Sequence, residues 1–247
     1  MKIILLFLIS MIFSMTGDEL SVLMNNRDSP KDISSNMNMK IVNKKGRERL
    51  LKVKSISKDN GEKQLLWFLS PADDKGISYL KIEHANKDDE IRLWLPAFKK
   101  IRRISSKKKA DSFMGSDLSY EDMTSRQMED YEFLIIKEEI INEQLCYLLE
   151  SKPKNGIKSE YSKHLTWVAK DNYLPIKEES YNNDRELLKL KKFKYTIIDS
   201  YNLVSEIFVE NIQKKSSTLL NFSDLKINTN IKNNLFQEKN MKRLPRK

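Results

Sequence analysis

The sequence predicts a mainly β protein (α+β class), built as one curved, largely up-and-down antiparallel sheet with two or three short helices. Two observations support this prediction. Short apolar or alternating segments follow one another with turn residues between them, and few helical segments separate them, which disfavours βαβ crossovers. A closed barrel, a half barrel and a sandwich are all compatible with this pattern. No linker rich in proline or glycine divides the chain, so residues 18–247 are expected to form a single domain.

Residues 1–17 have the pattern of a secretory signal peptide. Lys2 precedes an apolar run over residues 3–13, and small residues follow near an expected cleavage point at residues 15–17. The run is shorter than the roughly 20 residues of a membrane-spanning helix. A buried N-terminal strand is the alternative. The lone Cys146 lies in an apolar segment and is expected to be a buried thiol.

The first half of the expected domain begins with a helix and continues as strands. Leucine and methionine side chains at helical spacing predict a short amphipathic helix over residues 18–27. Turn-forming residues at 44–46, 59–61 and 86–89 then separate apolar or alternating segments. We expect strands over residues 37–41, 49–56, 64–69, 77–83 and 91–95.

The second half is expected to begin with a helix over residues 119–130, capped by Ser119 and Asp122. More strands are expected after it, and residues 233–244 are expected to be helical or irregular. These strands cover residues 132–136, 144–150, 164–169, 174–179, 187–195, 203–209 and 218–227.

The strand at residues 64–69 is apolar on both faces, whereas one face of an antiparallel sheet usually meets water. Two interpretations fit: a strand buried in a sandwich or under a helix, and a curved sheet with an apolar cavity on its concave side. The sequence does not assign which side chains face inward. The candidates for an apolar wall are Trp67, Phe68, Tyr79, Trp94, Leu95, Phe113 and Met114.

A basic run over residues 97–110 contains no acidic residue, in a chain whose net charge is +10. It can be a solvated edge strand and loop, or a docking surface for an anionic membrane or an acidic partner. Nucleic acid is not expected as a partner, because the chain is exported and the run lacks aromatic residues for base stacking. The docking candidates are Lys99, Lys100, Arg102, Arg103, Lys107, Lys108 and Lys109.

Catalytic signals are weak, so we expect no enzyme, no cofactor and no metal site. The two histidines, His84 and His164, do not have metal-ligand or catalytic-triad spacing. A metal site made by Asp117, Glu121 and Asp122 is a weaker interpretation than helix capping. A hydrolase with paired carboxylates is compatible with the sequence, because spatial pairing is not visible in it.

Several motifs resemble one known family, the LolA-like outer-membrane lipoprotein-sorting proteins, and within it the branch often found beside RND-type exporters. The central motifs are the more specific ones, and the resemblance covers nearly all of the expected domain. They are the segments at residues 46–49, 68–76 (with P-x-D-x-K-G), 94–96, 100–104, 113–117, 119–122, 161–163 and 167–168.

The resemblance implies an incomplete β-barrel whose concave apolar face is covered by helices. It also implies a periplasmic carrier of lipid or lipoprotein acyl chains, loaded by an inner-membrane transporter of the ABC or RND type and unloaded to an outer-membrane acceptor. In such carriers an early arginine holds the helical lid, and Arg49 or Arg47 matches it here. The segment from Trp94 to Asp122 is specific to this branch, so the cargo can be another lipid. A non-enzymatic accessory subunit of an RND-type export complex is the alternative function.

Overall fold

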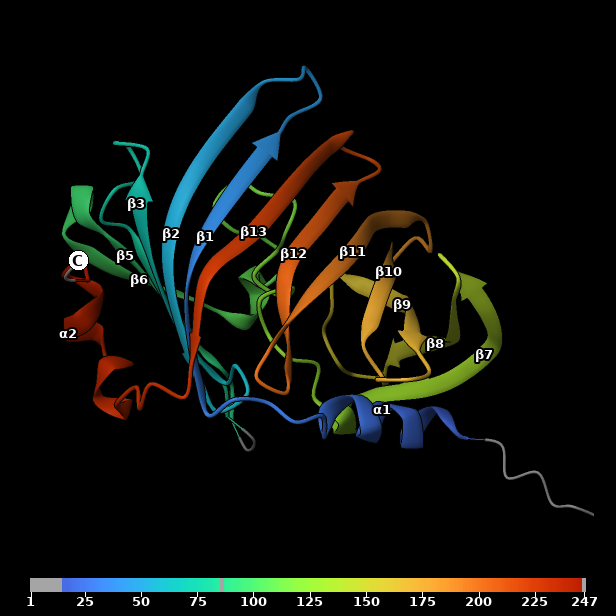
Figure 1. The fold of residues 1–247 in the computed structure, drawn as a ribbon. Coiled ribbons are helices and arrows are strands. Elements are labelled where there is room, and N and C mark those ends of the chain that lie inside the picture. Colours follow the sequence, from blue (N-terminus) through green and yellow to red (C-terminus); the bar gives the residue numbers. More distant parts are fainter. Residues whose placement is uncertain (1–14, 85–86, 246–247) are drawn as a thin grey trace, which may run out of the picture.

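The computed structural model describes residues 15–84 and 87–245, so most of the expected signal peptide lies outside the described residues. One antiparallel sheet of 13 strands dominates the fold, in the order β6-β5-β4-β3-β2-β1-β13-β12-β11-β10-β9-β8-β7 (Figure 1). The strands are β1(Asp32–Val42), β2(Glu48–Lys58), β3(Lys63–Ser70), β4(Ser78–Ile82), β5(Glu90–Leu95), β6(Lys100–Ile104), β7(Tyr131–Ile141), β8(Gln144–Pro153), β9(Tyr161–Ala169), β10(Pro175–Asn182), β11(Leu187–Ile198), β12(Tyr201–Asn211) and β13(Ser216–Ile227).

The sheet curves without closing, and β6 and β7 are its two edges. Neighbouring strands are consecutive in the chain, except that β1 pairs with β13 in the middle. The prediction of a mainly β chain with an incomplete antiparallel barrel and short helices is therefore confirmed. The basic segment at residues 100–104 is an edge strand, as one of the two interpretations held.

The predicted helix over residues 119–130 is wrong. Residues 120–123 form turns, residues 125–127 are irregular, and only the short 3-10 helix η3(Met128–Asp130) is helical. Ser119 and Asp122 do form cap-like hydrogen bonds, since the Ser119 amide donates to Asp122 Oδ2 at 2.8 Å. The helix does not continue because the Tyr120 ring is buried in the core and the Asp122 carboxylate binds lysines of β11.

The first helix, α1(Gly17–Asn25), is capped at its N-terminus and covers the sheet near β7. Thr16 and Glu19 form a reciprocal capping box, which satisfies free backbone amides of the first turn. Leu20 is buried against Leu149 of β8 and Val168 of β9. At Gly17, a Cβ atom would lie 2.4 Å from the backbone of Phe133 in β7, so the absence of a side chain permits this close approach.

The C-terminal segment covers the opposite face of the sheet, where it forms η4(Asn233–Leu235) and α2(Glu238–Met241). Phe236 and Met241 are buried against Leu65 and Trp67 of β3 and Leu80 of β4. This cover explains the doubly apolar strand, because successive side chains of β3 alternate between two covered faces. We call the face under the C-terminal segment the outer face, and the face under α1 the inner face. Among the residues that the structure describes, no helix has the length and apolarity to span a membrane.

Candidate functional site

The inner face is crossed by the long connection between β6 and η3, residues 105–127, which we call the crossover loop (Figure 1). Because β6 and β7 are opposite edges, this connection has to pass from one edge of the sheet to the other. It contacts β3 and β4 near one edge and β9 and β11 near the other. The curvature of the sheet brings these strands closer together, so that one loop contacts them all.

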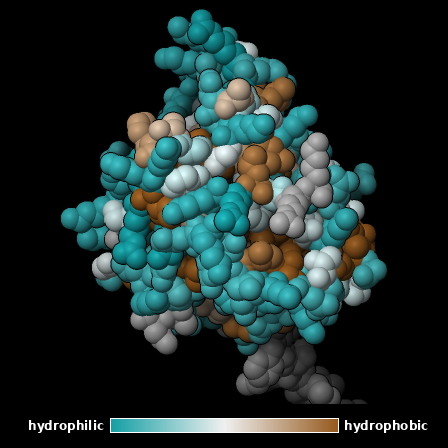
Figure 2. Space-filling model, turned by 90° about the vertical axis from the view of Figure 1, so that its left-hand side faces the viewer, coloured by the Kyte–Doolittle hydropathy of each residue, from teal (hydrophilic) through white to brown (hydrophobic). Residues whose placement is uncertain are grey.

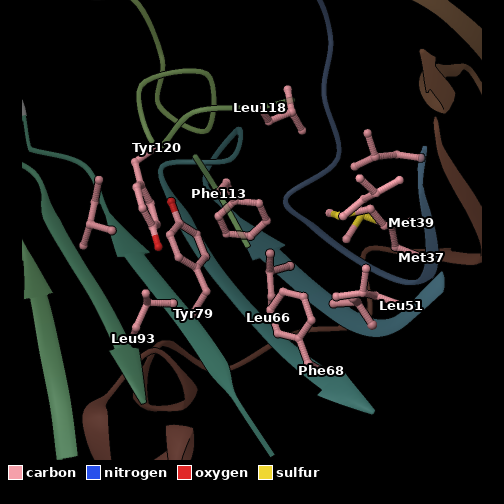
Figure 3. Packing of buried hydrophobic residues seen from close by; sticks show 14 of the residues in the cluster. Met37, Met39, Leu51, Leu66, Phe68, Tyr79, Leu93, Phe113, Leu118 and Tyr120 are labelled. Carbon is pink, nitrogen blue, oxygen red and sulfur yellow. The ribbon is translucent and has the colours of Figure 1, made fainter. Parts of the chain in front are cut away.

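The first part of the crossover loop packs into an apolar cluster formed by β1 to β6, β12 and β13 (Figure 3). Phe113 is fully buried, and its ring centroid lies 5.2 Å from that of Tyr79 in a T-shaped arrangement. It lies 6.2 Å from the Phe68 ring and 5.8 Å from the Tyr120 ring. Edge-to-face contacts of this kind stabilise aromatic pairs. The loop therefore fills the apolar half of the inner face with its own side chains.

The apolar wall candidates divide between the two faces. Phe68, Tyr79 and Phe113 come together on the inner face, and Met114 packs against the same cluster. Trp67 lies on the outer face, where its Nε1–H donates to the Asn240 carbonyl at 3.2 Å. Two other candidates lie at the end of β5: Trp94 packs with the outer cluster, and Leu95 is half-buried. Contact of any of them with a ligand stays a prediction.

Of the two arginines considered for holding a lid, Arg49 contacts the crossover loop. Its Nη1–H donates to the Met114 carbonyl at 3.0 Å, and its Nη2–H donates to both carboxylate oxygens of Asp74 at 2.6 Å. Arg47 is exposed in the hairpin between β1 and β2. The Arg49 guanidinium thus joins β2, the loop after β3 and the crossover loop.

The last part of the crossover loop docks into an ionic cluster on β9 to β11. Asp122 is buried and pairs with Lys189, at 2.9 Å from Nζ, and with Lys191. The Tyr161 hydroxyl donates to the same carboxylate at 2.9 Å and accepts from Lys189 Nζ at 2.7 Å. Buried charges persist only where they are paired and hydrogen-bonded, and this carboxylate is satisfied on both of its oxygens.

Arg126 and Glu178 extend the ionic cluster towards β9. The guanidinium binds both carboxylate oxygens of Glu178 at 2.8 Å, in a bidentate pair. Lys191 lies 3.1 Å from the same carboxylate and so bridges Glu178 and Asp122. His164, whose side chain is fully buried, accepts from Arg126 Nη2 at 3.2 Å through Nδ1.

These contacts change the pKa values of the buried groups. Burial alone would raise the pKa of Asp122, but Lys191 and Lys189 outweigh it and hold the pKa far below its ordinary value. Burial opposes ionisation of Glu178 in the same way, and Arg126 and Lys191 lower its pKa well below the ordinary value. Burial and then the Arg126 charge lower the pKa of His164. At neutral pH both carboxylates are therefore charged and His164 is neutral.

A pocket of about 500 Å³ opens beside the ionic cluster, between α1, the end of the crossover loop and β7 to β9. Its lining includes the apolar residues Met24, Phe133 and Leu149 and the polar residues Thr166 and His164. The pocket has both polar and apolar surface next to the loop that covers the sheet. Such a lining suits a small amphiphilic group.

The docking candidates gather at the β6 edge. Lys99, Lys100, Arg102, Arg103, Lys107 and Lys108 are exposed. Lys109 differs, because it pairs with Asp89 at 2.9 Å. Phe98, which is 71% exposed, lies two residues before the start of β6. The side of the molecule that bears β3 to β6 and α2 is mainly hydrophilic, with hydrophobic residues in separate patches (Figure 2).

The ionic cluster is the part of the site that sequence reasoning missed. Asp122 was assigned to capping or, more weakly, to a metal site. Within residues 15–84 and 87–245, no group of three or more His, Cys, Asp or Glu side chains is arranged to hold a metal ion. Lys189 and Lys191 lie in the strand predicted over residues 187–195, and the sequence assigns them no role. Their partner lies 67 and 69 residues away in sequence, so no local pattern reveals the pairing.

Comparisons with known proteins agree on the fold and the family. A family model described as "-like: Uncharacterized protein" matches residues 60–243. No curated protein matches the chain. A DUF1329 family protein from Desulfovibrio piger is similar, with a TM-score of 0.85, 31% identity, and coverage of 91% of this chain and 97% of that chain.

Two further solved structures are similar to the chain. One is a domain from Vibrio parahaemolyticus whose proposed role is outer membrane lipoprotein sorting; it has a TM-score of 0.84, 35% identity, and coverage of 92% of this chain and 98% of that chain. The other is a LolA superfamily protein from Nitrosomonas europaea, with a TM-score of 0.73, 19% identity, and coverage of 92% and 100%. The sequence and the fold together show that this chain belongs to the DUF1329 family and has the fold of a LolA superfamily protein.

Proposed function

We propose that this protein is an exported carrier that binds lipid or lipoprotein acyl chains on the inner face of its open sheet. The observation that carries the proposal is the cover of the apolar half. The inner face of β1 to β6 is apolar, and side chains of the crossover loop, not a second sheet, bury it. A loop held by non-covalent contacts can leave and be replaced by an apolar ligand. The proposed sorting role of the similar Vibrio parahaemolyticus domain supports the same function.

The free energy gained by burying the loop side chains is similar in size to that gained by burying an acyl chain, so one can replace the other. Burial of Phe113, Leu118 and Tyr120 contributes about 1.5–3 kcal/mol each, or about 5–9 kcal/mol together. Burial of an acyl chain of about 15 methylenes contributes about 12 kcal/mol, at about 0.8 kcal/mol per methylene. An acyl chain can therefore displace the loop, and the loop can cover the sheet again after the cargo leaves.

The proposal extends to the route of the cargo. An acylated molecule cannot cross an aqueous periplasm exposed without a cost of that size, so a container is needed between an inner-membrane transporter of the ABC or RND type and an outer-membrane acceptor. The basic β6 edge and the exposed Phe98 suit contact with an anionic membrane surface, where charge and an aromatic side chain act together.

Native mass spectrometry of the full exported chain, purified from membrane-bearing cells, tests the carrier function. A co-purifying lipid, and binding of a fluorescent fatty-acid probe, are the expected results. If no lipid is retained and no probe binds, the proposal is wrong.

A pair of variants locates the site. Phe113→Ala removes one competing side chain and should raise probe affinity about tenfold, because about 1.4 kcal/mol corresponds to a factor of ten. Phe236→Ala is the matched control: Phe236 is 3% exposed but lies on the outer face, so this variant should lose stability without a gain in affinity. Equal affinities for the two variants would place the acyl chain elsewhere.

A second candidate is the non-enzymatic accessory subunit of an RND-type export complex. The free, strongly basic edge strand β6 favours it, because an unpaired edge can add a strand of a partner protein. Co-purification with an exporter by a lipid-free chain would favour this candidate over the carrier.

A further inference from the structure

The pocket beside the ionic cluster contains two buried polar side chains with an unsatisfied atom. His164 is fully buried and Ser151 is 3% exposed, and both line the pocket. They face each other across the β8–β9 pair, so they share the inner face of the sheet. Neither His164 Nε2 nor Ser151 Oγ has a hydrogen-bond partner among the described residues. Buried polar atoms in native proteins are nearly always hydrogen-bonded, so this pair requires an explanation.

The surroundings of His164 determine where its proton lies. A guanidinium can only donate, so the 3.2 Å contact from Arg126 Nη2 makes Nδ1 the acceptor. The Ser180 hydroxyl lies 2.9 Å from the same Nδ1 and can donate to it as well. A neutral imidazole that accepts at Nδ1 carries its hydrogen at Nε2. The unsatisfied atom of His164 is therefore a donor, and its partner must supply an acceptor oxygen or nitrogen.

The charge of the pocket narrows the class of ligand. Its lining has five basic and five acidic side chains. The cations nearest to His164 are already paired, Arg126 with Glu178 and Lys191 with Asp122. An anionic group would find no free cation beside Nε2, and a cationic group would meet a donor. An uncharged acceptor fits this wall best.

Another part of the pocket wall is apolar. Met24 of α1, Phe133 of β7 and Leu149 of β8 line it and belong to one apolar cluster. A ligand that meets both sides has an uncharged acceptor next to a hydrocarbon chain. An ester or amide carbonyl at the head of an acyl chain has this composition.

We propose that this pocket binds the ester or amide carbonyl of an uncharged acylated lipid, with the carbonyl oxygen accepting from His164 Nε2–H and the first methylenes lying against Phe133 and Leu149. This inference rests on the proposed carrier function and names the part of the cargo that the protein recognises. Ser151 Oγ is the second polar contact for the same group.

Imidazole NMR tests the assignment directly, because the chain has only two histidines. Long-range proton–nitrogen spectra of the full exported chain should show His164 as a neutral Nε2–H tautomer, with His84→Gln used to assign it. Addition of methyl decanoate should shift the Nε2 resonance, and tridecane, which has the same number of heavy atoms, should not. A neutral Nδ1–H tautomer, or equal shifts with both probes, would overturn the proposal.

Affinities give a second, independent readout. Because tridecane is the more apolar probe, the readout is the ratio of methyl decanoate affinity to tridecane affinity, to which one hydrogen bond contributes a factor of about five to ten. His164→Leu and Ser151→Ala should each reduce this ratio. Ser78→Ala is the matched control, because it also removes a buried hydroxyl but that hydroxyl bonds to the Met241 carbonyl on the outer face, outside the pocket. If His164→Leu does not fold, Ser151→Ala and the spectra decide.

The outcomes separate this inference from the carrier function. An affinity ratio for the two probes that is the same in the wild type and in the variants would leave the carrier in place and refute the carbonyl contact. Preference for decanoic acid over its methyl ester would indicate an anion site and would also refute it. If no probe binds, the carrier function itself fails, and the inference fails with it.

Discussion

The two halves of the inner face are covered by one loop but hold it in opposite ways. On β1 to β6 the crossover loop inserts Phe113 and Tyr120 among apolar side chains. On β9 to β11 the same loop places Asp122 and Arg126 among buried charges. An acyl chain can replace apolar contacts, whereas it offers nothing to a buried lysine. We infer that the two parts of the loop have different roles. The apolar part exchanges with cargo, and the ionic part fixes the position to which the loop returns.

The largest expected effect comes from breaking the ionic half. Asp122→Asn leaves Lys189 and Lys191 buried without their shared carboxylate. We expect a loss of about 3–5 kcal/mol in the free energy of unfolding, measured by urea denaturation. Glu48→Gln, which breaks the exposed pair with Lys40, should change it by less than about 1 kcal/mol. Similar results for the two variants would show that the buried pairs do not hold the loop.

The pH dependence of stability distinguishes the ionic half from the apolar half. His164 has a lowered pKa in the folded state, because of burial and then the charge of Arg126, so only the unfolded chain takes up its proton as the pH falls below about 6.5. The free energy of unfolding should then fall by up to about 1.4 kcal/mol per pH unit.

At lower pH the carboxylates of the ionic cluster also change the free energy of unfolding. The pKa values of Asp122 and Glu178 are also lowered, so their contribution is present above the unfolded pKa of about 4 and is lost as the pH falls through the folded values. Denaturation curves at a series of pH values measure both steps. A His164→Phe variant should keep the acid step and lose the slope between about pH 6.5 and 5; an unchanged slope would contradict the assignment to His164.

A smaller effect is expected at the apolar end of the loop. Arg49→Ala removes the bond to the Met114 carbonyl and the pair with Asp74, and because this arginine is partly exposed the cost should be about 1 kcal/mol. Hydrogen exchange should quicken at the Ser116 amide, which bonds to Phe113 within the loop. Arg47→Ala is the control and should leave exchange there unchanged. Equal exchange in both variants would remove Arg49 from the contacts that hold the loop.

The smallest effect on stability is expected at the β6 edge. Changing Lys100, Lys107 and Lys108 to Glu should reduce binding to anionic vesicles by at least about tenfold, because each basic residue near such a surface contributes about 1 kcal/mol. Probe occupancy should not change. The control carries the same charge change in two other hairpins, at Lys44, Lys45 and Lys214. Loss of probe binding instead would place this edge at the entrance of the cavity.

The sequence predicts the strands well, because alternation and turn chemistry are local properties. Residues 59–61 form the expected turn between β2 and β3, and every expected strand overlaps an observed one. The face of each aromatic residue is not local. Trp67 lies on the outer face because a segment about 170 residues later covers it there. Its neighbour Phe68 lies on the inner face, because Phe113 of the crossover loop packs against it there.

The candidate site is less predictable than the fold. Arg49 was identified through the family resemblance, and the basic edge through its charge. The helix expected over residues 119–130 fails because its polar residues find distant partners: Arg126 binds Glu178, 52 residues away. Capping patterns report only local hydrogen bonds of a helix, and two buried ion pairs with distant residues stabilise the segment more than those local bonds. Lys189 and Lys191 alternate with leucines in β11, yet both lysines are buried.

The order of the strands has a consequence for how the chain can be divided. Each half is a continuous meander, and the two halves join through the β1–β13 ladder and through the C-terminal segment that packs on β3 and β4. The crossover loop is a covalent link between the edges but pairs with no strand of the ladder. A chain cut within it would form two fragments that still share a sheet, so fragment complementation should succeed. By the same connectivity, the loop can swing out of the interior while the sheet keeps all of its strand pairs.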